Sequence, residues 1–131
     1  MTTFVDTSAL YALLDAGDLS HVRAAQLFPE LVARETLLTH NYVLMETTAL
    51  VQRRLGMAAV ATLLNNLIRP LDIIWIDEQI HGHAADALLA AQARKVSPVD
   101  WTSFEVMRRR GLNCSFAFDD DFTAQGFRTI P

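Results

Sequence analysis

Hydrophobic and polar residues follow one another along the chain in blocks whose period changes several times. Short runs rich in β-branched and aromatic residues predict strands, and longer blocks with apolar residues at helical spacing predict helices. The expected strands cover residues 3–5, 36–39, 72–76, 114–118 and 128–130. The expected helices cover residues 9–15, 21–34, 41–54, 57–68, 78–95 and 99–110.

Strands that alternate with helices predict βαβ units, which build a parallel sheet with helices on both faces. We therefore expect an α/β fold, a three-layer α/β/α sandwich around a mainly parallel central sheet of four to five strands. The 131 residues show no internal repeat or linker, so we expect a single domain over residues 1–131. Binding sites of such sheets lie at the carboxyl ends of the strands, which makes acidic residues there informative.

Composition narrows the class of protein. Hydrophobic residues make up 51% of the chain and charged residues 20%, which argues against intrinsic disorder. Cys114 is the single cysteine, so an intramolecular disulfide and a multi-cysteine metal site are excluded. The N-terminus lacks the basic segment of a signal peptide, and no apolar run reaches the roughly 20 residues that span a bilayer. We therefore expect a cytoplasmic protein that does not enter a membrane.

The net charge of −4 argues against a purely electrostatic nucleic-acid binder. The basic residues are nevertheless clustered, and such clusters belong either to solvated helix faces or to surfaces that contact phosphate groups. Composition does not choose between these interpretations. The clusters that matter below are Arg53 with Arg54, and Arg108 with Arg109 and Arg110.

Two aspartates occupy positions where a local structural role and a site role are both open. Asp6 follows the first expected strand, where it either caps the next helix or lies at the active edge of the sheet. Asp100 closes the segment Ser97-Pro98-Val99-Asp100, which has the form of a capping box with proline at the first helical position. A helix N-terminus also lies next to sites that bind anionic substrates. Position alone therefore leaves both roles open.

Glu46 lies within the helix expected at 41–54, and its neighbours one turn away are apolar: Tyr42, Val43, Ala49 and Leu50. Its carboxylate is therefore expected in the middle of an apolar stripe. A carboxylate buried alone is costly to desolvate. We expect Glu46 to be paired with an arginine, protonated, or bound to a cation.

Three aspartates in succession, Asp119–Asp121, follow the strand expected at 114–118. One or two acids would suit a solvated turn, and three strain that interpretation. Together with Asp6, Glu46 and Asp100 they can converge at one edge of a parallel sheet. Carboxylates crowded into one pocket need a counter-charge.

Histidines are not spaced for a shared metal site. His21 and His40 are isolated, and His81 and His83 diverge on a helix because they are two residues apart. An all-oxygen site selects a hard cation, Mg²⁺ or Mn²⁺. We therefore expect such a cation where the acids converge.

Four segments, in this order, resemble the PIN domain family. They are Asp6-Thr7-Ser8-Ala9, Glu46 in the third helix, Ser97-Pro98-Val99-Asp100-Trp101-Thr102-Ser103-Phe104, and Phe118-Asp119-Asp120-Asp121-Phe122 followed by Gly126-Phe127. The likeness is to VapC-type toxins, the ribonuclease halves of bacterial and archaeal toxin–antitoxin pairs. Each segment alone is a weak signal, but their order and spacing are specific, and the likeness covers nearly the whole chain.

The resemblance implies a Mg²⁺- or Mn²⁺-dependent endoribonuclease whose acidic site comprises Asp6, Glu46, Asp100 and Asp119. Asp119 is favoured within the triplet because the family's aspartate lies three positions before its phenylalanine, here Phe122. Asp121 then becomes an auxiliary metal ligand, and Asp120 faces water. Ser8 and Ser103 match positions with small hydroxyl residues that orient a carboxylate or a metal-bound water.

The resemblance also implies partners. An RNA substrate, a cognate antitoxin and a second copy of the chain are expected, with the apolar region 60–71 taking part in the homodimer. The two arginine clusters become candidates for contacts with RNA or with the antitoxin.

Two other functions stay open. A phosphotransfer domain also places aspartates at strand ends, but a dehalogenase-like phosphatase needs a second aspartate where Ser8 stands. A receiver domain needs a lysine behind its last strand, and the only lysine is Lys95. A PIN-like binding or regulatory module without activity is the remaining alternative, against which the presence of all four acids argues.

Overall fold

The five strands form one sheet in a computed structural model that describes all residues, 1–131. Their order is β3-β2-β1-β4-β5, and all four neighbouring pairs are parallel. This confirms the α/β prediction and the mainly parallel sheet. The strands are β1 (Thr2–Val5), β2 (Thr36–His40), β3 (Leu71–Ile74), β4 (Cys114–Phe116) and β5 (Arg128–Ile130).

Helices connect every pair of consecutive strands. α1, α5 and α6 begin at an Asp or Ser side-chain cap, as expected where such a residue precedes a helical block. Gly111, with φ of 66°, ends the longest C-terminal helix in the left-handed conformation that favours glycine. The helices are α1 (Thr7–Leu14), α2 (His21–Arg34), α3 (Asn41–Leu55), α4 (Met57–Thr62), the π-helical η1 (Leu63–Leu67), α5 (Glu78–Ala91), α6 (Pro98–Arg110) and α7 (Asp121–Ala124).

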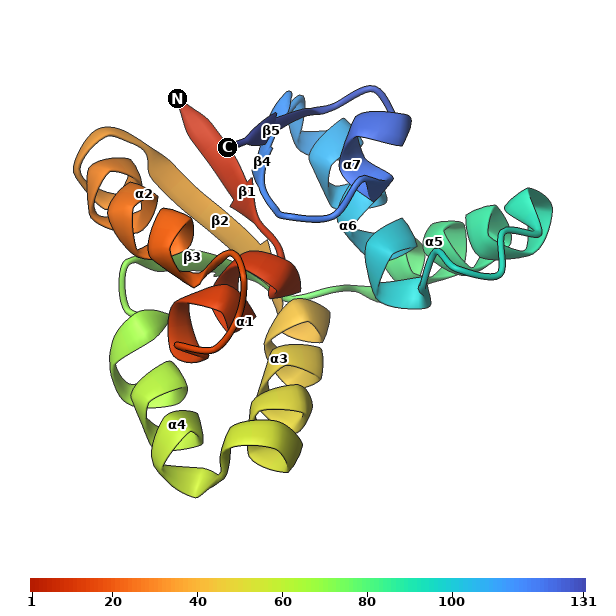
Figure 1. Cartoon of the computed structure of the whole chain (residues 1–131). Coiled ribbons are helices and arrows are strands. Elements are labelled where there is room, and N and C mark those ends of the chain that lie inside the picture. Colours follow the sequence, from red (N-terminus) through yellow and green to blue (C-terminus); the bar gives the residue numbers. More distant parts are fainter.

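Aromatic contacts show that helices cover both faces of the sheet. Phe28 of α2 stacks on Phe116 of β4, with ring centroids 6.5 Å apart. On the other face, Phe122 of α7 lies 5.9 Å from Phe4 of β1 and 5.1 Å from Phe104 of α6. The three-layer arrangement is therefore present, and α5 extends away from the sheet beside α6 (Figure 1).

Several elements end earlier than the sequence pattern predicts. The helix expected at 78–95 stops at Ala91, because Gln92 adopts a left-handed conformation with φ of 54°. The strand expected at 72–76 stops at Ile74, and the Ile76 N–H donates to Asn41 Oδ1 at 2.7 Å instead of continuing a ladder. The helix expected at 57–68 is divided into α4 and η1.

The C-terminal region contains an element that the pattern does not predict. The strand expected at 114–118 ends at Phe116, and Asp121 begins the short helix α7. The buried Phe122 holds α7 against α6. None of the helices combines the length and apolar character needed to cross a membrane.

Candidate active site

Three carboxylates meet at the carboxyl edge of the sheet. Asp6 directly follows β1, Asp119 follows β4, and Asp100 lies in the first turn of α6. One oxygen atom of each lies within 4.8 Å of the others. β1 and β4 are adjacent and parallel, so their carboxyl ends are neighbours, and the Asp6 N–H donates to Phe116 O at 3.1 Å. Topology therefore assembles the cluster from three distant parts of the sequence.

Ser8 fixes the carboxylate of Asp6 and links it to the loop after β4. Its Oγ donates to Asp6 Oδ2 at 2.7 Å, and its backbone N–H donates to the same oxygen at 3.1 Å. The Oγ also accepts from the Phe118 N–H at 3.0 Å. Asp6 is the N-cap of α1 and is only 3% exposed. Asp6 is thus both a cap and a member of the cluster.

Local hydrogen bonds also orient the other two carboxylates. Asp100 accepts from the Ser97 N–H at 3.0 Å, and Ser97 Oγ accepts from the Asp100 N–H at 3.1 Å, which completes the predicted capping box. Asp119 Oδ1 accepts from the Asp121 N–H at 3.2 Å. Asp121 is half-buried beside the cluster but outside its closest set, and Asp120 is exposed.

Burial and mutual repulsion make the ionised state of these acids costly. Burial is the main reason that the pKa of Asp6 rises from 3.8 to about 7, and the negative charge of Asp119 adds to the rise. Burial also raises the pKa of Asp100 and of Asp119. The cluster is therefore destabilised as long as its charges are not offset.

The chain itself does not offset these charges. Its ion pairs join Glu35 to the N-terminus and Glu105 to His83 and Arg109, and none involves Asp6, Asp100 or Asp119. Three converging carboxylate oxygens without a nitrogen or sulfur ligand suit a hard divalent cation. The donor set thus fits Mg²⁺ or Mn²⁺.

The structure does not bring Glu46 into this cluster. The buried face of α3 is formed by Val43, Thr47 and Val51, so the expectation that Glu46 sits in the middle of a buried stripe is wrong. Met45 and Ala49 beside it are exposed, and Glu46 is half-buried. It lines an open apolar hollow that also includes Val99, the residue before Asp100. Of its apolar neighbours, Tyr42 and Ala49 line this hollow, whereas Val43 packs in the core, and Glu46 has no ion pair.

Ser103 is fully buried in the middle of α6 and forms no hydrogen bond with the three carboxylates. Its Oγ donates to Val99 O at 3.0 Å and lies 2.8 Å from Nε2 of His40. His40 is the N-cap of α3, because its Nδ1 accepts from the Tyr42 and Val43 N–H groups. Nε2 therefore carries the proton and donates to Ser103.

His40 is the residue that the sequence pattern missed. Sequence spacing leaves His40 an isolated histidine. In the structure it ties the start of α3 to the middle of α6, so it connects the helix of Glu46 with the helix of Asp100. Burial lowers its pKa from 6.5 to about 4, so it is neutral at pH 7. Its position directly before a helical block, where a cap is needed, was the available signal.

The arginines of α3 and α6 occupy different ends of the molecule. Arg53 and Arg54 are exposed near the end of α3, and the Arg54 guanidinium lies over the ring of Tyr11, 5.5 Å from its centroid. Arg108–Arg110 end α6, at about 1.5 Å per residue some 12–15 Å along the helix from Asp100. Arg54 lines the same hollow as Ser8 and Asp119, whereas Arg108–Arg110 lie at the end of α6 opposite to Asp100.

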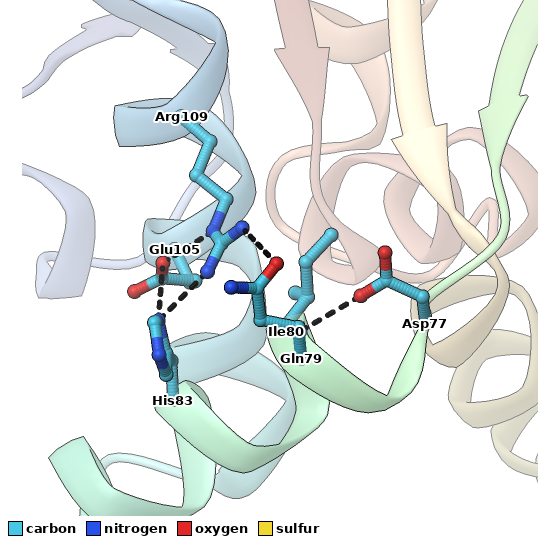
Figure 2. Close-up of polar contacts among 6 residues, drawn as sticks. All are labelled: Asp77, Gln79, Ile80, His83, Glu105 and Arg109. Atoms are coloured by element: carbon cyan, nitrogen blue, oxygen red, sulfur yellow. Dashed lines mark hydrogen bonds and ion pairs between the residues drawn. The ribbon is translucent and has the colours of Figure 1, made fainter.

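Arg108 and Arg109 also have partners within the chain. Arg109 Nε donates to Glu105 Oε2 at 2.6 Å, and Arg109 Nη2 lies 2.7 Å from His83 Nδ1 of α5 (Figure 2). Arg108 Nη2 donates to Gln125 Oε1 at 2.9 Å. These contacts join α6 to α5 and to the segment after α7, which is a structural use of two of the clustered charges.

Comparison with known proteins identifies the family. The PIN domain model matches residues 3–127. The 23S rRNA-specific endonuclease VapC20 of Mycobacterium tuberculosis is 39% identical over 125 residues, which is 95% of this chain and 94% of that protein. The crystal structure of VapC20, a Sarcin-Ricin loop cleaving toxin, matches with a TM-score of 0.85 and 37% identity over 97% of this chain and 96% of that one.

A more distant structure supports the fold alone. DNA-bound VapBC from Salmonella typhimurium matches with a TM-score of 0.70 and 21% identity over 99% of this chain and 98% of that chain. The family match, the sheet order and the three carboxylates at its edge agree with one another. The chain belongs to the PIN domain family.

Proposed function

We propose that this chain is a metal-dependent endoribonuclease that hydrolyses RNA phosphodiester bonds, acting as the toxin of a type II toxin–antitoxin pair. The observation that carries the proposal is the cluster of Asp6, Asp100 and Asp119, which converge without a basic partner. The relationship to an endonuclease over nearly the whole chain supports the same conclusion. A cluster that costs stability at neutral pH is explained if it binds a cation needed for activity.

Asp6, Asp100 and Asp119 are proposed to hold Mg²⁺ or Mn²⁺ and to be the catalytic carboxylates. The bound cation supplies positive charge against the charge that develops on the phosphate, and it makes water a stronger nucleophile. Glu46 and Asp121 flank the cluster and are proposed to complete the acidic site around the cation.

The chain's own contribution is to hold the carboxylates in place before RNA binds. Ser8 orients Asp6, Ser97 orients Asp100, and the backbone of Asp121 orients Asp119. These bonds reduce the reorganisation that binding requires. Ser103 is proposed to act at a distance, by keeping α6 in register with α3 through His40.

Ribosomal RNA is the substrate we propose to test first, because the relative VapC20 acts on 23S rRNA. A chain with a net charge of −4 repels a polyanion unless a cation intervenes. RNA binding is therefore expected to depend on the divalent cation as much as cleavage does. The cytoplasm is the compartment that this substrate implies.

The protein partners of this proposal are an antitoxin and a second copy of the chain. A groove lined by Leu44, Met45, Leu64 and Trp75 carries large exposed apolar side chains, with Trp75 at 75% and Met45 at 69% exposure. Leu64 falls within the region 60–71 expected to take part in a homodimer. We expect a dimer by light scattering, and a monomer for Trp75→Lys.

The test of the function is cleavage of 23S rRNA by purified protein. We expect cutting with Mg²⁺ or Mn²⁺, none with EDTA, and recovery when the cation is restored. Asp6→Asn should abolish it, and equal cleavage by Asp6→Asn and wild type would remove the nuclease assignment. A folded wild-type protein that never cuts RNA would instead favour an inactive binding module.

A further inference from the structure

A hollow of about 400 Å³ opens directly beside the three carboxylates. It lies between α1, the loop after α1, the second half of α3 and the loop after β4. Ser8 and Asp119 form part of its wall, so the hollow is continuous with the carboxylate site. We call it the α1–α3 hollow. Its volume falls in the range of about 300–1,000 Å³ typical of small-molecule sites.

Arg54 is the one basic residue in the wall of the α1–α3 hollow. Its guanidinium is held over Tyr11, whose hydroxyl in turn donates to Asp15 at 2.7 Å. Arg54 is exposed and forms no ion pair, and its contact with the Tyr11 hydroxyl uses only part of its five N–H donors. A planar guanidinium on an aromatic ring is a preorganised phosphate binder. Phe118 adds an aromatic surface to the same wall.

We propose that the α1–α3 hollow binds the nucleotide adjacent to the scissile bond, with Arg54 pairing with its phosphate. This rests on the proposed function, which places the scissile phosphate at Asp6, Asp100 and Asp119. A strand held there must leave the site through neighbouring concavities, and this one shares Ser8 and Asp119 with it. RNA is favoured over a protein ligand because the hollow continues the site where a phosphate must lie.

The salt dependence of RNA binding tests the role of Arg54. The probe is a fluorescein-labelled RNA stem–loop with the sarcin–ricin sequence, measured by anisotropy in Mg²⁺. Every variant is made in a Glu46→Gln background that is checked to leave the RNA uncut, because this change keeps Asp6, Asp100 and Asp119 for the cation. We expect Arg54→Ala to weaken binding about tenfold and to reduce the slope of log K against log salt by about one. Arg54→Lys should keep the slope and lose part of the affinity.

Arg34→Ala is the matched control, because it removes the same charge from an exposed residue at the end of α2. Arg34 lies just before β2, at the edge of the sheet opposite to the carboxylates, and forms no ion pair. Its slope should equal that of the background protein. Equal effects of Arg54→Ala and Arg34→Ala, or an unchanged slope for Arg54→Ala, would overturn the proposal.

Leu19 gives a second test that does not depend on the packing of Arg54 against Tyr11. Its side chain is fully exposed at the wall of the hollow, so substitution leaves the core intact. Leu19→Lys should tighten RNA binding and Leu19→Glu should weaken it, each about threefold. If neither changes binding while cleavage still requires Mg²⁺ and Asp119, the hollow does not bind RNA, and the proposed function stands without it.

Discussion

The two ends of α6 handle charge in opposite ways. At its start, Asp100 joins the buried Asp6 and the half-buried Asp119 in a cluster without a basic partner. At its end, Arg109 is bonded to Glu105 and His83, so opposite charges are matched. The helix dipole favours an acid at the start and a base at the end, so it supports both arrangements. The two ends differ because Asp100 at the start of α6 has no basic partner, whereas Arg109 at its end has an acidic one.

This contrast separates two uses of charged residues within one helix. Matched charges at a solvated end add modest stability, whereas like charges gathered in a buried place reduce it. A fold keeps buried like charges where a bound ligand of opposite charge offsets their repulsion. Substitutions at the start of α6 and its neighbours should therefore affect activity strongly, and substitutions at its end should affect stability weakly.

The largest expected effect comes from the acid that follows β4. Asp119→Asn should lower the rate of RNA cleavage by at least about 100-fold, the size typical of losing one charge-stabilising group in an active site. Asp120→Asn, the same change at the exposed neighbour, should have little effect. Cleavage rates at saturating Mg²⁺ measure both. The reverse order would mean that Asp120, not Asp119, is the site residue.

The next largest effect is on stability: Asp6→Asn should stabilise the fold although it abolishes the proposed activity. Asp6→Asn removes a buried charge, and Asn caps a helix as well as Asp does. In EDTA at pH 8 we expect the free energy of unfolding to rise on the order of 3 kcal/mol. Asp86→Asn, on the exposed surface of α5, should leave it nearly unchanged.

The sign of its pH dependence follows from the raised pKa. Asp6 ionises near 3.8 in the unfolded chain and near 7 in the folded one, so the wild type loses stability as the pH rises between these values. The advantage of Asp6→Asn should therefore be small below pH 4, grow up to about pH 7 and then stay constant. Urea unfolding across this range measures it, and a constant difference would contradict the buried charge.

A smaller effect is expected in the middle of α6. His40→Asn keeps a cap on α3 but is too short to reach Ser103, so one buried polar group loses its partner. We expect a loss of about 1–3 kcal/mol at pH 8. Ser103→Ala tests the same bond from the other side, and the double variant should lose less than the sum of the two.

This loss should diminish in acid. Unfolded His40 takes up a proton near pH 6.5, whereas folded His40 resists it down to about pH 4, so the wild type loses stability over that interval. The gap between wild type and His40→Asn should narrow as the pH falls from 6.5 to 4. A gap that stays the same in thermal unfolding at both pH values would mean that His40 is not buried as described.

The smallest effect is expected at the C-terminal end of α6, where Glu105 pairs with Arg109. Glu105→Gln removes the charge that pairs with Arg109 and should cost at most about 1 kcal/mol, less at high salt. RNA cleavage should stay at the wild-type rate. A loss of cleavage here comparable with that of Asp119→Asn would break the distinction between the two ends of α6.

Sequence periodicity was sufficient to predict a parallel sheet, because strands alternate with helices along the chain, and all five expected strands are present. The order of the strands within the sheet was not predicted. Asp6 was identifiable because it directly follows a strand. The triplet that contains Asp119 was identifiable because it follows the strand expected at 114–118, and the PIN resemblance favoured Asp119 within it. Other features depend on tertiary packing. Tyr42 and Ala49, beside Glu46, line an open hollow instead of the core, and Ser103 turns inward toward His40. Neither direction is encoded in helical spacing, because a helix has the same period whichever face is buried.

The double role of Asp6 has a consequence for how the gene can change. One substitution to asparagine would silence the proposed activity while leaving the cap on α1 and a more stable fold without metal. Lineages that lose the proposed activity by this route would keep a folded chain, together with any surface that binds the proposed partners. Selection against the activity therefore need not remove the protein. Copies that are inactive but folded can arise through this single substitution.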